Sequence, residues 1–182
     1  MPVYDFESPE RFVAGTVGPP GQRTFFLQAR EGRRVVSVSC EKEQLVILAD
    51  RLLDLLDDLA GEAGSDAAAA AYSDDGPLES PIEDEFRVTS LSLGWDGDRR
   101  VVLIEVQRDD DEVLAARAEG EESEDELEPE SALRVVLGPA QARAFARRAR
   151  AIVSAGRPPC PFCGGPLDPD GHVCPRANGY RR

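Results

Sequence analysis

The chain has 182 residues, with 35 Asp or Glu against 21 Lys or Arg, so its formal net charge is −14. An apolar fraction of 41% is enough to fill a hydrophobic core, which excludes a chain that is disordered throughout. The excess of acid argues against a body that binds nucleic acid, because affinity for phosphate comes from neutralising it with Lys and Arg.

Neither a membrane segment nor a signal peptide is expected. No apolar run approaches the roughly 20 residues that a spanning helix needs, and the segment 1–5 does not begin a signal peptide. We therefore expect a cytoplasmic protein that makes no contact with a membrane. At this length the natural expectation is one domain with an appendage.

Residues 1–62 form the first predicted unit. Extended segments at 12–17 and 24–29 flank a Gly-containing turn, which predicts a hairpin. Alternating apolar residues at 36–40 predict a third strand with one buried face. The apolar pattern of 41–62 predicts a helix, so the unit is read as βββα.

The same pattern returns after a predicted linker at 63–84 that is rich in Ala, Gly and Asp. Gly18, Gly21 and Arg23 recur in order as Gly94, Gly97 and Arg99, and the helix residues Gln44, Ala49 and Arg51 recur as Gln141, Ala146 and Arg148. Residues 85–156 are therefore predicted to be a second βββα unit, which makes the chain an internal duplication.

An acidic insertion separates the second and third strands of the second unit. Residues 109–130 contain twelve acidic residues against Arg117, a net charge of −11, which leaves −3 for the rest of the chain. This composition, without aromatic residues, predicts a disordered loop. The expected fold class is thus α+β: two tandem βββα units that form an antiparallel sheet with two helices, followed by a small zinc-knuckle-like tail at 157–182.

The tail carries the strongest local motif of the chain. Cys160, Cys163, His172 and Cys174 include three of the four cysteines and the sole histidine. A Cys-x2-Cys pair followed by Gly can aim two thiolates at one point, and His-x-Cys can supply two more ligands. Such a set suits Zn²⁺, and four protein ligands leave no position for water or substrate, which predicts a structural ion.

Other interpretations of these cysteines stay open at the level of sequence. A redox pair is disfavoured because no strand leads into a helix at the motif, and a structural disulfide is disfavoured by the cytoplasmic compartment. A catalytic site with three thiolates, a bound water and a free His172 lacks a carboxylate at a deaminase-like spacing. A metal-free tail is the remaining alternative.

The chain resembles a family of uncharacterised, duplicated actinobacterial proteins. The resemblance rests on the ending that runs from Cys160 to Arg182, on the opening Tyr4-Asp5-Phe6 with the segment 9–12, and on Gly-Gln-Arg-Thr-Phe at 21–25. It covers essentially the whole chain. The resemblance implies a domain of unknown function and brings no catalytic residues.

The sequence contains no recognisable catalytic constellation. With the sole histidine assigned to the metal, no Ser-His or Cys-His pair can be formed, and no phosphate-binding glycine loop occurs. Cys40 is interpreted as a small buried residue. We therefore expect no catalytic and no cofactor-binding residues, and we interpret the chain as a protein-interaction adaptor or regulator whose acidic loop attracts an unidentified protein partner.

Two other functions are kept as alternatives. An enzyme or small-ligand site could lie in a cleft between the two units, near Trp95 and Arg23 or Arg99. Binding of RNA or single-stranded DNA is possible for the tail, where Phe162 and Tyr180 could stack on bases beside several arginines, but is not expected for the body. A homo-oligomer is also possible.

Overall fold

The computed structural model describes residues 2–109, 131–156, 160–165, 167, 172, 174 and 176. No helix among the described residues is long and apolar enough to cross a membrane. The strands are β1 (Val3–Phe6), β2 (Arg11–Val17), β3 (Thr24–Glu31), β4 (Arg34–Cys40), β5 (Asp84–Arg87), β6 (Ser90–Asp96), β7 (Val101–Arg108) and β8 (Ser131–Leu137), and the helices are α1 (Lys42–Leu59), the short α2 (Asp66–Ala69) and α4 (Pro139–Ser154).

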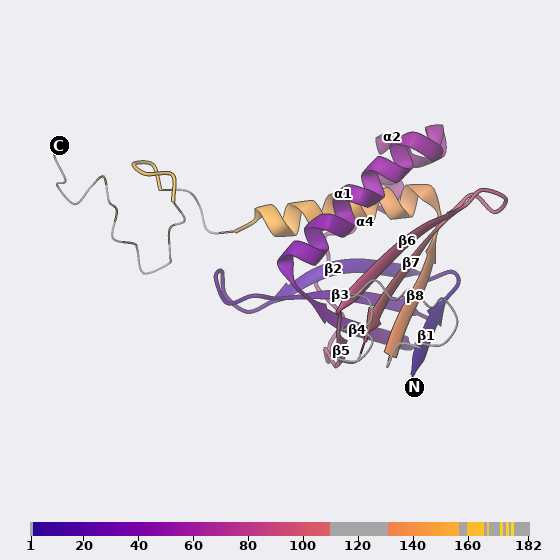
Figure 1. The fold of residues 1–182 in the computed structure, drawn as a ribbon, viewed down its shortest axis with the longest axis horizontal. Coiled ribbons are helices and arrows are strands. Elements are labelled where there is room, and N and C mark those ends of the chain that lie inside the picture. The colour runs from indigo at the N-terminus through magenta and orange to yellow at the C-terminus, as the bar shows by residue number, and fades with distance from the viewer. Residues whose placement is uncertain are drawn as a thin grey trace, which may run out of the picture.

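These elements form two four-stranded sheets with the long helices α1 and α4 packed across them (Figure 1). The α+β class is confirmed. The three strands and the helix predicted for each unit occur in the expected order, and α4 begins with Pro139 in its first turn, where the missing N–H of proline costs nothing. Helix α1 begins with a capping box in which the Glu41 side chain accepts from the Gln44 backbone.

The sheets are mixed, whereas the sequence predicted antiparallel pairing. In each repeat the last three strands are antiparallel, as β2-β3-β4 and β6-β7-β8. Two short strands that the sequence did not reveal, β1 and β5, then pair in parallel with the other repeat: β1 lies beside β8, and β5 lies beside β4. Each repeat therefore gives its first strand to the sheet of its partner repeat.

The helices follow the same exchange. Helix α4 of the second repeat contacts β2, and helix α1 of the first repeat contacts β6. Arg23, beside the β2–β3 turn, donates to the carbonyl of Ala155 at the end of α4, while Arg100, in the β6–β7 turn, donates to the carbonyl of Ala60 at the end of α1. A cation at a helix C-terminus satisfies carbonyls that lack an intrahelical partner.

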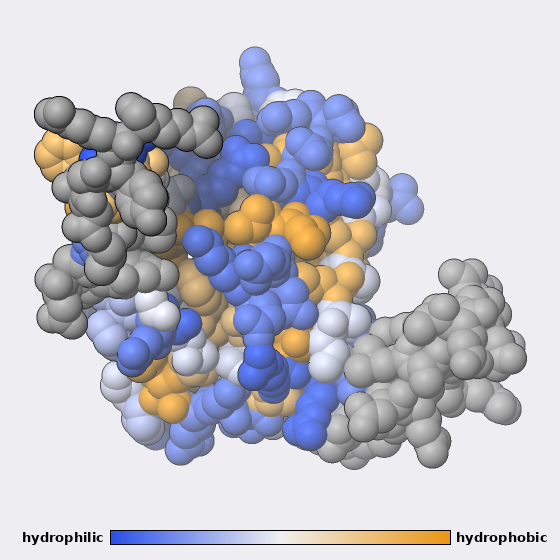
Figure 2. Space-filling model, turned by 60° about the vertical axis from the view of Figure 1, so that its left-hand side comes forward, coloured by the Kyte–Doolittle hydropathy of each residue, from blue (hydrophilic) through white to orange (hydrophobic). Residues whose placement is uncertain are grey.

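Both repeats share one hydrophobic core. The buried cluster contains residues of both sheets and both helices, among them Phe6 of β1 and Phe86 of β5. Phe12 of β2 stacks on Phe145 of α4 with ring centroids 4.6 Å apart. Because the core is continuous, neither repeat buries its apolar face alone. At the surface, apolar side chains are exposed in patches between hydrophilic ones (Figure 2).

Acidic residues of α1 face arginines of α4. Asp50 pairs with Arg150 at 2.7 Å, and Asp57 pairs with Arg143, which also donates to the carbonyl of Gly64. The arginines of α4 thus join the two antiparallel helices across the repeats.

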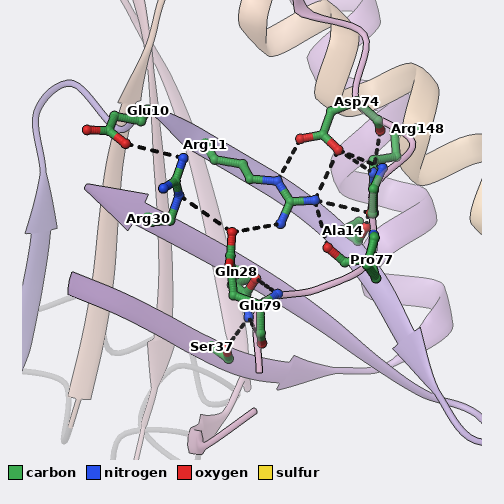
Figure 3. Close-up of polar contacts among 11 residues, drawn as sticks. Glu10, Arg11, Ala14, Gln28, Arg30, Ser37, Asp74, Pro77, Glu79 and Arg148 are labelled. Atoms are coloured by element: carbon green, nitrogen blue, oxygen red, sulfur yellow. Dashed lines mark hydrogen bonds and ion pairs between the residues drawn. The ribbon is translucent and has the colours of Figure 1, made fainter. Parts of the chain in front are cut away.

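The segment 63–84, predicted as a linker, contains α2 and a short 3₁₀ turn at Ala70–Tyr72, and another 3₁₀ turn, Gly61–Gly64, leads into it. Its second part, residues 74–79, is called the strap here because it is bound along the outer face of the first sheet (Figure 3). The Arg11 guanidinium holds the Asp74 carboxylate with bonds of 2.6 and 3.0 Å and also donates to the Pro77 carbonyl. Arg148 donates to the carbonyls of Gly76 and Ala14, at 2.7 Å each.

Gln28 fastens the far end of the strap. Its side chain lies in the middle strand β3 with only 1% of its surface exposed. The amide accepts from the Glu79 backbone N–H at 2.7 Å and donates to the Glu79 carbonyl at 3.1 Å and to Ser37 Oγ at 2.9 Å. Every polar function of this buried amide is therefore used. Beside it, Gly15 leaves room for the Leu78 side chain, which a β-carbon at residue 15 would displace.

The strap predicts that Asp74→Asn destabilises the protein. Hydrogen bonds from Arg11 lower the pKa of Asp74 to about 2, although burial opposes ionisation. Loss of the carboxylate weakens two charge-assisted contacts, so the free energy of unfolding should fall by about 1–3 kcal/mol. Urea denaturation measures it. Asp75→Asn, at an exposed neighbouring position, is the matched control and should change stability by no more than about 0.5 kcal/mol.

The same contact predicts a pH dependence. Folding lowers the pKa of Asp74, so the ionised carboxylate contributes to the free energy of unfolding. This contribution is complete above the pKa that an Asp has in the unfolded chain, about 4, and is lost as the pH falls towards 2. The stability difference between wild type and Asp74→Asn should therefore be constant between pH 5 and 7, within about 0.5 kcal/mol, and shrink below pH 4. A difference that persists unchanged at pH 3 would contradict the assignment.

Candidate metal centre

Four potential ligands converge in the tail. The Sγ atoms of Cys160, Cys163 and Cys174 and one ring nitrogen of His172 all lie within 4.8 Å of one another. Cys160 and Cys174 are buried, and Cys163 and His172 are half-buried. The four residues that the sequence singled out therefore form one group that could hold a metal ion.

The local backbone explains how the first two thiols come together. The Gly164 N–H donates to the Cys160 carbonyl at 2.8 Å, and the Cys160 N–H donates to the Gly165 carbonyl at 2.7 Å, which closes a tight turn. Gly164 has φ +75°, a left-handed conformation that glycine adopts without strain. A β-carbon at Gly165 would sit 3.4 Å from the sulfur of Cys163. At Gly164 a β-carbon would meet nothing within 4 Å, so the left-handed backbone rather than lack of space favours glycine there.

The observed separations suit tetrahedral coordination. Zinc–sulfur bonds of about 2.3 Å give a tetrahedron whose edges are about 3.8 Å. The sulfurs of Cys160 and Cys174 are 3.8 Å apart, and Cys163 Sγ lies 3.3 Å from His172 Nε2. All cysteines in the structure are free, and the Cys160–Cys174 separation is far longer than a disulfide bond of about 2.05 Å.

The surroundings lower the pKa of one thiol in the group and raise that of another. Burial opposes ionisation of Cys160, but hydrogen bonds from the Cys163 and Phe162 backbone N–H groups lower the pKa of its thiol below the ordinary value. For Cys163, the Gly165 backbone N–H lowers the pKa, but burial and the neighbouring Cys160 and Cys174 raise it above the ordinary value. Neighbouring thiolates repel one another, and a bound divalent cation would offset this repulsion and stabilise their ionised form.

The histidine presents Nε2 to the cysteines. Its other ring nitrogen, Nδ1, is buried and has no hydrogen-bond partner in the part of the chain that the structure describes. Metal-bound histidines usually donate this second N–H to a carbonyl, carboxylate or water. The donor set fits a metal ion, with Nε2 as the ligand atom.

The other residues weighed from sequence are dispersed over the body. Cys40 is buried, and desolvation raises the pKa of its thiol to about 12, so it is not a nucleophile. Of the two arginines weighed for a cleft between the units, Arg99 pairs with Glu7, whereas Arg23 donates to the Ala155 carbonyl. Residues 110–130 of the acidic insertion, and Tyr180, lie outside the described residues.

The sequence suggested Arg23 for a site between the two units but did not reveal its neighbours. Arg23 lines a cavity with Lys42, Phe25 and Val153, which come from the start of α1, from β3 and from the end of α4. No pattern along the chain could have revealed this grouping, because the elements are joined only by tertiary packing.

Comparison with known proteins identifies a family. The sequence model of a family described as "Protein of unknown function (DUF3090)" matches residues 4–174, which covers most of the chain and includes all four potential ligands. No curated protein and no solved structure matches the chain.

Proposed function

Because the chain belongs to the family described as Protein of unknown function (DUF3090), membership supplies no activity, and we propose a function from the chemistry of the described residues. The protein is proposed to be a non-catalytic interaction adaptor or regulator whose tail is held by one structural Zn²⁺ ion. The ligands are Cys160, Cys163, His172 and Cys174.

The donor set supports zinc in a structural role. Three thiolates and one imidazole are the ligands that Zn²⁺ prefers over the oxygen-loving Mg²⁺ and Ca²⁺. A tetrahedron completed by four side chains has no vacant position at which water or substrate could be activated. In a segment as short as the tail, which cannot build a core, binding of the ion contributes directly to folding.

The observation that carries the interaction proposal is the position of Phe162. In the sequence it lies between the ligands Cys160 and Cys163. Its exposed fraction, 64%, is larger than that of any other large apolar side chain that the structure describes. Exposing an aromatic ring to water gives no folding energy, whereas a rigidly held aromatic is the kind of residue that dominates binding at protein interfaces. The turn thus presents Phe162 to a partner.

The rest of the chain is consistent with a role in binding. The sole histidine belongs to the ligand group, and the buried thiol of Cys40 is unreactive. The segment 109–130, with its net charge of −11, would attract a partner that carries exposed arginines, and salt would weaken that attraction.

Single-stranded nucleic acid is the second candidate, favoured by one contact. Arg176 donates to the Phe162 carbonyl at 3.3 Å, which places a guanidinium at the backbone of the residue that carries the exposed ring. An aromatic face next to an arginine is the arrangement on which unpaired bases stack. The protein partner is preferred because the chain as a whole is strongly acidic.

The zinc assignment predicts about one zinc ion per chain. Metal analysis of protein purified under reducing, chelator-free conditions measures it. Cys163→Ala should lose the ion, because three ligands remain. Cys40→Ala removes a cysteine from the core and is the control that should retain it. Equal zinc in both variants, or none in the wild type, would contradict the assignment.

Phe162→Ala tests the interaction role without touching a ligand. The variant should keep its zinc but capture at least about tenfold less partner protein from a lysate of a cell that encodes the chain. Removal of an aromatic residue at the centre of an interface typically costs about 2 kcal/mol of binding free energy, which lowers the affinity by more than about tenfold. Ile47→Ala, which removes an exposed apolar side chain from α1, is the matched control and should capture partner normally.

A parallel measurement distinguishes the two candidates. Retention of a labelled single-stranded oligonucleotide at physiological salt, abolished by Phe162→Ala, would replace the protein partner by nucleic acid. Unchanged protein capture by Phe162→Ala, with no oligonucleotide binding, would count against both.

A further inference from the structure

We propose that a groove in the folded body, separate from the metal-ligand group, binds an extended acidic segment of a partner protein. The groove lies between the tip of the β2–β3 hairpin, the start of α1 and the end of α4, and it is called the hairpin groove here. In Figure 1 this hairpin reaches out beneath the end of α4 from which the chain continues to the tail. The proposal goes beyond the zinc-bearing tail and does not depend on it.

The hairpin groove has the size and lining of a binding site. Its volume is about 510 Å³, within the range of about 300–1,000 Å³ usual for ligand sites. Pro20, Phe25 and Val153 supply apolar surface, and Ser154 supplies a hydroxyl. Figure 2 brings this end of the body forward and shows apolar side chains exposed between hydrophilic ones.

Both charged residues that line this cavity are cations, Arg23 and Lys42. In a chain with a net charge of −14, two cations facing one cavity without an acid among its lining residues are unusual. The Ala155 carbonyl accepts from Nη1 of Arg23, which holds the guanidinium at the cavity, and its other N–H groups donate to no residue in the part of the chain that the structure describes. Lys42 forms no ion pair within the described part of the chain.

A second cavity makes the groove long. It measures about 400 Å³, shares Arg23, Phe25 and Lys42 with the first, and continues along the end of β4 to Arg87. Glu41 and Glu43 also line it, but Glu41 is already engaged with Arg87 and with the cap of α1. The long shape suits an extended peptide: a carboxylate would lie between Arg23 and Lys42, and an apolar side chain would pack on Phe25 and Val153.

The duplication shows that helix capping does not require this pair of cations. At the other end of the body Arg100 caps α1 as Arg23 caps α4. The helix position that Lys42 occupies at the start of α1 is taken by Pro139 at the start of α4. The capping contact is thus common to both ends, and the additional cation belongs to the hairpin groove alone.

Binding of a short fluorescein-labelled peptide of alternating glutamate and leucine, measured by fluorescence anisotropy, tests the proposal. The wild-type chain should bind it saturably and should not bind the matching uncharged glutamine–leucine peptide. Lys42→Glu should weaken binding by about tenfold or more, because a like charge then faces the carboxylates. Arg33→Glu makes the same charge change in the exposed β3–β4 turn and is the matched control, which should bind like the wild type.

The proposal would be overturned by equal weakening of peptide binding in Lys42→Glu and Arg33→Glu, or by the absence of saturable binding. Full displacement of the peptide by millimolar inorganic phosphate would also overturn it, because the groove would then be a site for small anions. Cys163→Ala and Phe162→Ala should bind the peptide normally. The two proposals can therefore fail separately: loss of zinc or of the exposed ring affects the tail, and Lys42→Glu affects only the hairpin groove.

Discussion

Parallel pairing of each repeat's first strand with the last strand of the other repeat is the constraint on which the structure depends. Without β5, strand β4 would present an open edge of unpaired N–H and C=O groups, and without β1 the same would hold for β8. The exchange also carries Phe6 and Phe86 into the shared core. The two repeats therefore fold as one body, although each has its own hairpins and its own helix.

The exchange requires the chain to travel from the end of α1 to the far edge of the first sheet, and this path explains the strap. Arg11, Arg148 and Gln28 bind its backbone and the half-buried carboxylate of Asp74, so a connection that looks like a flexible linker in the sequence becomes a cover for the sheet. The hairpin groove has the same origin. The end of α4 reaches the β2–β3 turn and the start of α1 because α4, a helix of the second repeat, packs on strand β2 of the first repeat. The two proposed binding regions thus have different physical bases: the tail depends on a local ligand cluster, and the hairpin groove depends on the exchange.

Much of the fold could be predicted because its signals are local. Extended segments that flank a Gly-containing turn marked the hairpins, and alternating apolar residues marked the third strand of each unit. Pro139 marked the start of α4, and the spacing of Cys160, Cys163, His172 and Cys174 marked a group that the structure brings within 4.8 Å. Strands β1 and β5 could not be found in this way. Each has four residues, too few for a periodic pattern, and each is held in place by a partner far along the chain.

The sequence by itself determined the duplication, the meander strands, the two long helices and the ligand group, since each rests on residues that are close along the chain and interact through turns, periodicity or a short metal-binding motif. Only the tertiary structure decided that the repeats exchange strands, that Arg11 and Arg148 converge on Asp74, and that Arg23 meets Lys42 at one groove. The physical reason is that these contacts join residues from separate elements, and the sequence around each residue shows no motif. The contacts can form and stabilise the fold only after the shared core has brought those elements together.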